Sequence, residues 1–256
     1  MKRKDQIKII AILKDLVAIN TSYPPGNSTQ LNNYIFNYLK GAKLNVSLKG
    51  PHKNKLSLIA KNYNGKQKSI VFNSHIDTVQ PNKKDWITDP FTLTKKGNYL
   101  HGLGAVNCKG SAAVHVYLAS QLKNLFPNLK EKISFTFVTD EENLGPDGSF
   151  YLRKKKLINP HTLILGAPTN NNFIVEERGV FWASVYVKGK TSHAGEPHKG
   201  INAIEKANKI IYNLQTKYRI SLKKFNIHNQ LSTMNIGLMN GGHNVNVVPS
   251  NAYFQI

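Results

Sequence analysis

Hydrophobic residues in the first two thirds of the chain recur with two different periods. A helical period predicts helices over residues 4–19, 29–41, 109–126 and 147–157. Short apolar runs predict strands over residues 56–63, 69–76, 132–140 and 161–167. The third run is nearly continuous, which is typical of burial on both faces, and the fourth reads as another short buried strand. Strands that alternate with helices indicate an α/β layer fold with a largely parallel sheet, in which ligands bind at the carboxyl ends of the strands.

Turn-forming residues add local expectations. Asn64-Gly65, between the first two predicted strands, is a dipeptide typical of hairpins. Ser28 or Thr29 is the expected N-cap of the second helix. The Pro/Gly segment "SYPPGN" (22–27) ends the first helix.

The pattern changes near Arg178, where a second domain is expected. Residues 180–190 alternate like a half-exposed antiparallel strand, 200–218 read as an amphipathic helix, and two further strands follow over 231–242 and 244–256. This β-α-β-β order predicts a smaller α+β domain over 179–256, after an α/β domain over 1–178. The apolar stripe of the helix consists of Ile204, Ala207, Ile210, Ile211 and Leu214.

Composition limits the class of protein. The chain has 256 residues, of which 40% are hydrophobic, as in an ordinary globular protein. No apolar run is long enough to span a bilayer, and the basic start reads as an amphipathic helix rather than a signal peptide. A single cysteine, Cys108, excludes an intrachain disulfide framework. We therefore expect a cytoplasmic protein without a membrane partner.

The formal net charge of +21 raises the question of a nucleic-acid partner. Nearly all of this charge is lysine spread along the chain, whereas arginine is the better bidentate reader of phosphate and guanine. The sequence shows no helix-turn-helix, zinc-finger or aromatic-basic RNA signature. A solvated basic surface is therefore favoured over specific nucleic-acid binding.

Polar residues follow two of the predicted strands at the point where each ends. His75 and Asp77 close one strand, and residues two apart point to the same side, so the carboxylate can hold the imidazole. A metal-binding histidine is commonly oriented in this way. The alternative is a polar pair at the surface.

Asp140, Glu141 and Glu142 come at the end of the apolar run "ISFTFV" (133–138) and repel one another. A metal would relieve that repulsion, with one glutamate as ligand and its neighbour as general base. The alternative is a solvated acidic turn. Two further loops, 102–113 and 166–171, have the small residues typical of site loops, yet neither supplies a charged ligand. The neutral Asn107 stands at the centre of the first.

Eight motifs carry a resemblance that covers essentially the whole chain. Their order and approximate spacing resemble those of the acetylornithine deacetylase / succinyl-diaminopimelate desuccinylase / carboxypeptidase G family. The resemblance implies a zinc-dependent amide hydrolase acting on N-acyl amino acids or small peptides, with a catalytic α/β domain and an inserted α+β lid that forms a homodimer. The motifs are "LVAINTSYPPGN", "NSHIDTVQP", "WITDPF", "HGLGAVNCKGSAA", "TDEENLG", "LGAPT", "VKGKTSHAGEPHKGINAI" and "GGHNVNVVPSNA".

The resemblance assigns expected roles residue by residue. His75 resembles a zinc ligand, and Asp77 resembles the acid that orients it. Glu141 is similar to the general base that deprotonates the attacking water, and Glu142 is similar to a ligand of the second zinc.

Two residues of the second domain are also assigned by the resemblance. His193, in "KTSHAG", resembles the lid histidine that reaches a partner subunit's site and stabilises the developing oxyanion. Asn246 lies in a stretch that resembles a substrate-binding lid loop.

The chain departs from the family pattern at metal-ligand positions. Asn107 stands where the family has an aspartate that bridges both zinc ions, and Ala167 stands where it has an acid that ligates the first. Leu103 replaces the usual arginine, and the family's C-terminal return segment, with a last zinc-binding histidine, is expected to be missing beyond Ile256.

These departures change the electrostatics of a zinc pair. Two dications about 3.5 Å apart repel by about 19 kcal/mol at an effective dielectric of about 20, used as a scale rather than as a net energy. Of the family's three ligating carboxylates only that of Glu142 remains. A tight zinc pair is therefore not expected in this chain alone, and we expect weak or absent activity. The two principal hypotheses are an impaired metallohydrolase and a non-catalytic homologue that dimerises or binds.

Overall fold

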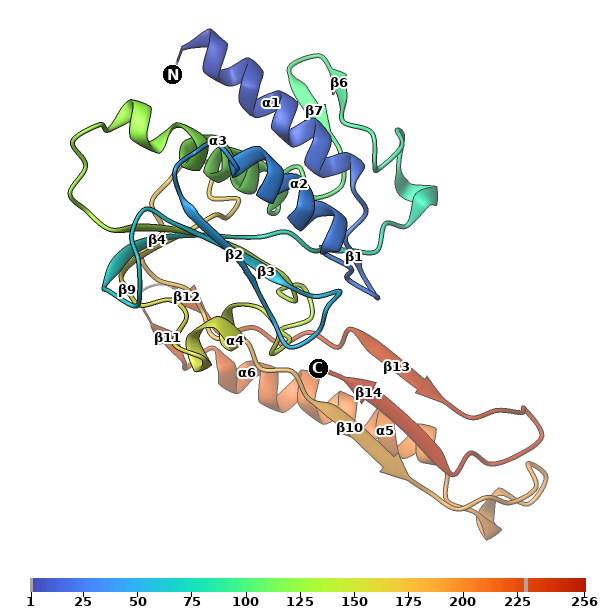
Figure 1. Cartoon of the computed structure of the whole chain (residues 1–256). Helices are drawn as coiled ribbons and strands as arrows, with labels where there is room; N and C mark the ends of the chain where they lie inside the picture. Colours follow the sequence, from blue (N-terminus) through green and yellow to red (C-terminus); the bar gives the residue numbers. More distant parts are fainter. Residues whose placement is uncertain (1, 228–229) are drawn as a thin grey trace. The chain divides into compact units, whose positions relative to one another are not determined.

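The computed structural model describes residues 2–227 and 230–256. They fall into two compact units that meet between Asn172 and Phe173 (Figure 1). Each unit has its own buried apolar cluster, and each is described by itself below.

The first unit is built on a five-stranded sheet in the order β2-β3-β8-β4-β9. β8, β4 and β9 run parallel, β3 runs antiparallel to β8, and β2 runs antiparallel to β3. Four of the five strands therefore point the same way, which confirms the predicted α/β fold with a mostly parallel sheet. The strands are β2 (Asn45–Lys49), β3 (Ser57–Lys61), β4 (Ser69–His75), β8 (Ile133–Val138) and β9 (Pro160–Leu165).

Three helices lie on one side of this sheet, the second and third against it and the first packed on the third, and a short helix packs on the other face (Figure 1). Because side chains alternate along a strand, Phe135 and Phe137 of β8 join the cluster under the first three helices. Val138 instead packs with Leu152 of the fourth helix. The helices are α1 (Arg3–Ala18), α2 (Thr29–Leu39), α3 (Lys109–Leu125) and α4 (Ser149–Lys154).

Small elements connect this framework. β1 (Ser22–Tyr23), which follows α1, pairs in parallel with β5 (Thr78–Val79), which follows β4. A hairpin of β6 (Thr94–Lys96) and β7 (Tyr99–His101) precedes the loop that leads into α3, and a 3-10 turn covers Lys83–Asp85.

The predicted helices of the first unit are present, with ends that differ from the prediction by up to three residues. Ser28 occupies the N-cap position of α2, but its hydroxyl donates to the main-chain oxygen of Leu56 at 2.9 Å and caps no helix N–H. The serine therefore ties the start of the helix to the segment before β3.

The hairpin predicted at Asn64-Gly65 is wrong. β3 and β4, on either side of it, do not pair, because β8 lies between them in the sheet. Ser134 of β8 faces Lys61 on one side and Val71 on the other. β8, which comes much later in the sequence, therefore pairs with β3 at the position where the Asn64-Gly65 turn predicted β4.

β9 is at the edge of the sheet and is not buried, contrary to the prediction. It pairs only with β4 among the described strands, and all six of its residues are exposed. Leu163 and Leu165 keep 48% and 55% of their surface, because no described element covers this strand's outer side. The apolar run that suggested a central strand therefore belongs to an exposed edge.

The second unit runs from β10 through α5 to β13 and β14, with a short strand pair, β11 and β12, between the helix and β13. β10, β14 and β13 form an antiparallel sheet in that order, and α5 packs on it through Val187, Ala203, Ala207 and Phe254. The elements are β10 (Ser184–Lys188), α5 (Ala203–Asn213), a π-helical turn (Leu214–Tyr218), α6 (Arg219–Leu222), β11 (Asn226–Ile227), β12 (Gln230–Leu231), β13 (Leu238–Gly241) and β14 (Asn251–Gln255), with a 3-10 turn at Pro197–Lys199.

The predicted apolar stripe of α5 is only partly buried. Ala207 is buried, and Ile211 and Leu214 pack against the same cluster. Ile204 and Ile210 remain 36% and 37% exposed, so the helix turns a narrower face to its sheet than the periodicity indicated.

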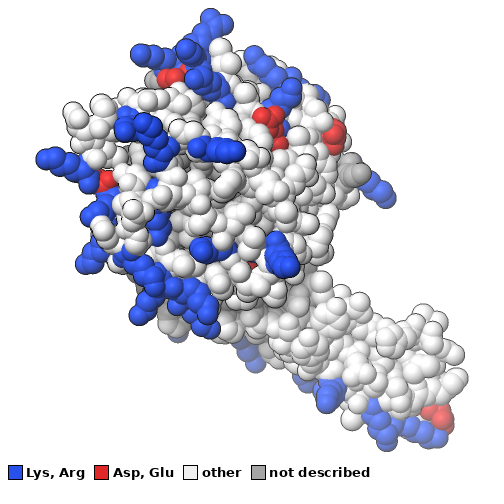
Figure 2. Space-filling model, viewed as in Figure 1, with Lys and Arg blue, Asp and Glu red and all other residues white. Residues whose placement is uncertain are grey.

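Basic side chains are distributed over the surface. Figure 2 shows Lys and Arg spread across the visible face of the first unit, with few Asp or Glu between them. In the described residues, no helix has the length and apolar character needed to cross a membrane.

Candidate metal centre

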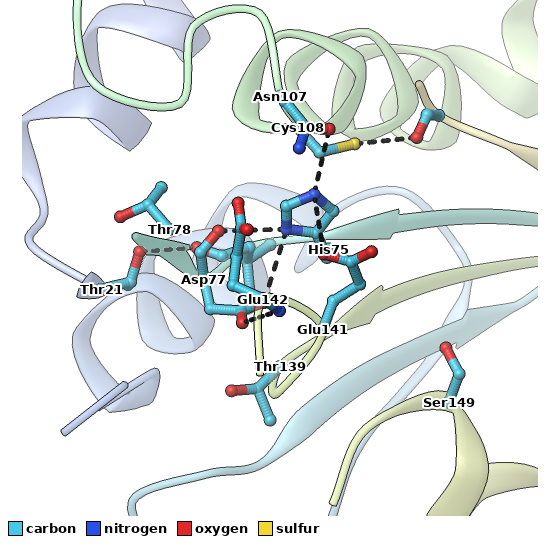
Figure 3. Close-up of polar contacts among 12 residues, drawn as sticks. Thr21, His75, Asp77, Thr78, Asn107, Cys108, Thr139, Glu141, Glu142 and Ser149 are labelled. Carbon is cyan, nitrogen blue, oxygen red and sulfur yellow. Dashed lines mark hydrogen bonds and ion pairs between the residues drawn. The ribbon is translucent and has the colours of Figure 1, made fainter. Parts of the chain in front are cut away.

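Three segments that are far apart in the sequence meet at the carboxyl ends of the parallel strands (Figure 3). β4 ends at His75, which lies opposite Val138 at the end of β8. The turn after β8 carries Glu141 and Glu142, and the loop before α3 contributes Asn107. The sheet thus brings predicted site residues from three segments to one place.

His75 is held through one ring nitrogen and offers the other. Its imidazole is 6% exposed, and Nδ1 lies 3.1 Å from the main-chain oxygen of Asp77 and 3.5 Å from its carboxylate Oδ1. Nε2 lies 3.2 Å from Oδ1 of Asn107 and 3.6 Å from Oε2 of Glu141. A cation ligated by His75 would therefore bind at Nε2, between an amide oxygen and a carboxylate.

Asp77 links the two strand ends. Its side chain is 1% exposed, and while Oδ1 faces His75, Oδ2 accepts the main-chain N–H of Glu142 at 3.0 Å. The neighbouring main chain is fixed as well, because the Thr21 hydroxyl donates to the oxygen of Ile76 at 2.6 Å. Asp77 therefore contacts the imidazole through its main-chain oxygen, with carboxylate Oδ1 nearby, and its other carboxylate oxygen fixes the main chain at Glu142.

The charges at this site shift two pKa values upward. Burial lowers the pKa of His75, but the hydrogen bond and charge of Asp77 and the charge of Glu141 outweigh it and raise the pKa to about 9. Burial raises the pKa of Glu142; the charge of His75 lowers it, and the charges of Glu141 and Asp77 raise it further. The rise at His75 comes from the neighbouring carboxylates, whereas the rise at Glu142 comes first from burial.

Asp140 does not belong to this group, although it adjoins Glu141. Its backbone has φ +69°, and its carboxylate points to Lys55, whose Nζ lies 3.2 Å away. The predicted repulsion among three acids is therefore relieved partly by a lysine. His75, Glu141 and Glu142 remain, with one ligand atom from each within 4.8 Å of the others.

The loop that carries Asn107 is shaped by small residues. Gly104 has φ +75°, and a Cβ there would lie 2.8 Å from Cγ2 of Thr78, so the close approach requires glycine. The Asn107–Cys108 peptide bond is cis, and Cys108 is buried with Sγ 3.1 Å from the main-chain oxygen of Gly166. Asn107 is thus presented to His75 by a loop packed against the end of β9.

Ala167 follows β9 and supplies no donor from its side chain. The main chain of Gly166 bonds to Asn73 of β4 at 2.7 Å, which places this loop beside the strand that ends at His75. Ala167 itself is exposed. The position is near the site in the fold, but its methyl group can neither ligate nor balance a cation.

Two buried titratable side chains near the site were not predicted. Lys109 is fully buried, its Nζ donates to the main-chain oxygen of Ile19 at 2.8 Å, and burial lowers its pKa to about 7. His115 of α3 lies beneath β4, with Nδ1 2.6 Å from Oγ of Ser74. Lys109 could have been noticed as a charge inside a loop of small residues, whereas His115 looks like an ordinary residue of an amphipathic helix.

His115 gives a pH prediction. Burial lowers its pKa from 6.5 to about 4, so the unfolded chain binds its proton first as the pH falls. Its contribution to stability is complete above pH 6.5 and is lost as the pH falls toward 4, by up to about 3 kcal/mol. Urea unfolding at pH 7 and pH 4.5 should therefore show His115→Gln losing less stability on acidification than the wild type.

The matched control for this measurement is His198→Gln, because His198 is exposed. It should keep the wild-type dependence on pH. An equal loss of stability on acidification in His115→Gln and in the wild type would contradict the buried, neutral state of this imidazole.

His193 and Asn246 lie side by side in the second unit. The main-chain N–H of Ala194 donates to the oxygen of Asn246 at 3.0 Å, and His193 forms a β-bridge with Val247. Nδ1 of His193 accepts the N–H of Gly195 at 3.1 Å, and both predicted residues are exposed. A cavity of about 490 Å³ lies against these two loops, lined among others by Ala194, Asn244 and Val247.

The donor set of the first unit fits one divalent cation. His75 Nε2 and the carboxylates of Glu141 and Glu142 converge, and these two charges balance one dication. A second dication would meet the neutral Asn107 and Ala167, where repulsion between the metals would not be offset. The residues present therefore do not fit a metal pair.

Sequence comparisons give a consistent set of relatives. The family model described as peptidase family M20/M25/M40 matches residues 71–235. An acetylornithine deacetylase of Buchnera aphidicola subsp. Schizaphis graminum is 31% identical over 93% of this chain and 64% of its own length. A succinyl-diaminopimelate desuccinylase of Buchnera aphidicola subsp. Acyrthosiphon pisum is 29% identical over 75% of this chain and 53% of its length. The chain thus spans about two thirds or less of these relatives.

Solved structures share the fold. An M20 family metallo-carboxypeptidase of Sulfolobus solfataricus aligns with a TM-score of 0.68 at 15% identity, over 100% of this chain and 70% of that one. A tripeptidase of Staphylococcus aureus aligns with a TM-score of 0.65 at 21% identity, over 98% and 65%. A Bacillus subtilis protein described as a dinuclear metal binding peptidase of the M20 family aligns with a TM-score of 0.58 at 16% identity, over 99% and 64%.

Proposed function

The chain belongs to peptidase family M20/M25/M40, and on that premise we propose that it is an amide hydrolase of N-acyl amino acids or small peptides whose site holds one divalent cation, with zinc as the first candidate. The observation that carries the proposal is the convergence of His75 with Glu141 and Glu142, whose ligand atoms lie within 4.8 Å of one another. Asn107 and Ala167 supply no further charge for a second cation.

The residues of the first unit have different proposed roles, which follow from how far each side chain is exposed. Asp77 is buried and fixes the imidazole of His75, so that Nε2 faces the cation position. Glu142 is partly buried beside it and serves as a ligand. The Glu141 side chain is half exposed, at 50%, and can take a proton from the attacking water and pass it to the leaving amine. A bound divalent cation would supply Lewis-acid polarisation of the amide carbonyl.

The residues of the second unit are proposed to contact substrate. His193 and Asn246 are exposed beside a cavity, and both can donate hydrogen bonds to the oxygens of an acyl amino acid. In this proposal, as the family resemblance implies, the chain forms a homodimer in which His193 reaches the site of a partner subunit and stabilises the negative oxygen that forms during attack. Asn246 orients the substrate.

With one cation in place of two, turnover is proposed to be slow. A single dication stabilises less of the developing charge than a pair does, and the neutral amide of Asn107 cannot replace a bridging carboxylate. The chain's 31% identity to an acetylornithine deacetylase makes N-acetyl amino acids the first substrates to test, followed by N-succinyl amino acids and small peptides.

The test is hydrolysis of these substrates with and without added Zn²⁺, Co²⁺ or Mn²⁺. We expect slow turnover that requires the cation, and a loss of about 100-fold or more in Glu141→Gln, because a general base contributes roughly that factor. Glu131→Gln, at an exposed glutamate outside the site, is the matched control and should leave the rate unchanged.

A second candidate function is a homologue that binds acyl amino acids without hydrolysing them. The absence of a side-chain donor at Ala167 and the neutral Asn107 favour it. Bound cation and bound substrate without any cation-dependent turnover would establish this candidate and overturn the hydrolase.

A further inference from the structure

The turn that carries Glu141 and Glu142 is held at its start by a partly buried ion pair. The Asp140 side chain is 1% exposed, and its Oδ1 lies 3.2 Å from Nζ of Lys55, which comes from the loop between β2 and β3. Its Oδ2 accepts the main-chain N–H of Asp147 at 3.0 Å. The carboxylate is therefore bound on both oxygens, once by a distant lysine and once by its own turn.

This turn closes tightly around the Asp140 carboxylate. The N–H of Gly145 donates to the main-chain oxygen of Asp140 at 2.9 Å, and the N–H of Leu144 donates to that of Glu141 at 2.9 Å. A Cβ at Gly145 would lie 1.8 Å from Oδ2 of Asp140, so only glycine leaves room for the carboxylate. The left-handed φ of +69° at Asp140 sends its side chain away from those of Glu141 and Glu142.

Lys55 is fixed from several sides. Its Nζ lies 5.0 Å from the centre of the Tyr23 ring, and its side chain is 19% exposed. Its main-chain N–H donates to the oxygen of His52 at 3.1 Å, and the preceding residue, Asn54, accepts the N–H of Ser28 at 2.8 Å. An ammonium held in this way can serve as an anchor rather than as a freely moving surface charge.

We infer that Lys55 is a positioning residue for the glutamate pair. Its ammonium fixes Asp140, and the turn fixed at Asp140 directs Glu141 and Glu142 toward His75. The far end of the pair is held by Asp77, which accepts the N–H of Glu142 at 3.0 Å. The inference rests on the proposed function in one respect, namely that the two glutamates receive a cation.

A role of Lys55 through its charge and a role through holding the turn predict opposite changes in cation affinity when Lys55 is replaced. If the ammonium acted only through its charge, Lys55→Met would remove a positive charge near the site and tighten the binding of a divalent cation. If it acts by holding the turn, the same variant loosens the glutamates and weakens binding, by about tenfold or more, as when other supports of metal ligands are removed. A purely structural role would change Tm and leave the dissociation constant unchanged.

The experiment compares the wild-type chain, Lys55→Met and Lys55→Arg by amide hydrogen exchange without metal and by Co²⁺ titration. In Lys55→Met we expect the amides of Glu142, Leu144 and Gly145 to exchange about tenfold faster or more, and the Co²⁺ Kd to rise by about tenfold or more. Lys55→Arg should restore both values toward the wild type. Lys53→Met, at an exposed lysine of the same loop, is the matched control and should leave both values unchanged.

The outcomes separate this inference from the proposed function. Wild-type exchange rates at these amides in Lys55→Met would overturn the positioning role, whatever the wild type binds. Tighter Co²⁺ binding by the variant would also overturn it and leave a purely electrostatic effect. A wild type that binds no Co²⁺ would instead contradict the proposed function, and the exchange rates would still decide the role of Lys55.

Discussion

Replacing Asn107 by Asp and Ala167 by Glu together is expected to raise the cation content of the chain from about one to about two. Asn107 Oδ1 already lies 3.2 Å from Nε2 of His75, so an aspartate there would place a charged oxygen beside the first cation. The loop that carries Ala167 bonds to β4 beside the strand end. Two new carboxylates would offset the repulsion between two dications, which is the main obstacle to a pair.

Elemental analysis after dialysis against metal-free buffer measures the stoichiometry, and hydrolysis of N-acetyl amino acids measures the gain in rate. We expect that gain to reach about 100-fold or more, because a second cation contributes several kcal/mol of charge stabilisation. The matched control is Asn171→Asp with Ala11→Glu, which makes the same charge change at exposed positions. A double variant that keeps about one cation would show that the lost carboxylates do not limit the site.

Replacing His75 by Ala is expected to abolish tight binding of the single cation. In the proposed site His75 supplies the nitrogen donor, and its Nδ1 lies 3.1 Å from the main-chain oxygen of Asp77. Removing it leaves two adjacent carboxylates, one of which is half exposed, and these resemble an ordinary acidic turn. We expect the Kd for Zn²⁺ or Co²⁺ to rise by about 1,000-fold, whereas Asp77→Asn, which keeps the ligands but loosens their support, should cost about 10- to 100-fold.

Calorimetric titration measures both constants, and His198→Ala is the matched control at an exposed histidine. If the Kd of His75→Ala were within about tenfold of the wild-type value, the cation would bind at a place other than Nε2 of His75. Equal losses in His75→Ala and Asp77→Asn would instead mean that Asp77 is itself a ligand.

The convergence of His75 with Glu141 and Glu142 could be predicted because its signals are local in the sequence. His75 and the three acids follow apolar runs, and parallel strands bring their carboxyl ends to one edge. The resemblance added the roles proposed for Glu141 and Glu142, but the divergence of Asp140 from its neighbours could not be predicted. That divergence depends on a left-handed backbone and on Lys55, which lies 85 residues earlier in the chain.

The errors in the predicted fold have the same physical origin. The Asn64-Gly65 dipeptide indicates a turn but cannot say which strands will pair, and β8 occupies the place beside β3. The apolar run of β9 shows side chains that are suited to burial, but it does not show whether another element covers them. In the structure all six residues of the strand are exposed. Buried groups such as Lys109 and His115 were missed because their burial arises only when α3 packs between the sheet and α1.

The most direct test of the single-cation site is the number of divalent cations bound per chain at saturation. Purified protein would be stripped with a chelator, loaded with Zn²⁺ or Co²⁺, dialysed and analysed for metal and for protein in the same sample. The account predicts about one cation per chain in the wild type and about none in His75→Ala. About two cations per chain in the wild type, or an equal content in both proteins, would contradict it.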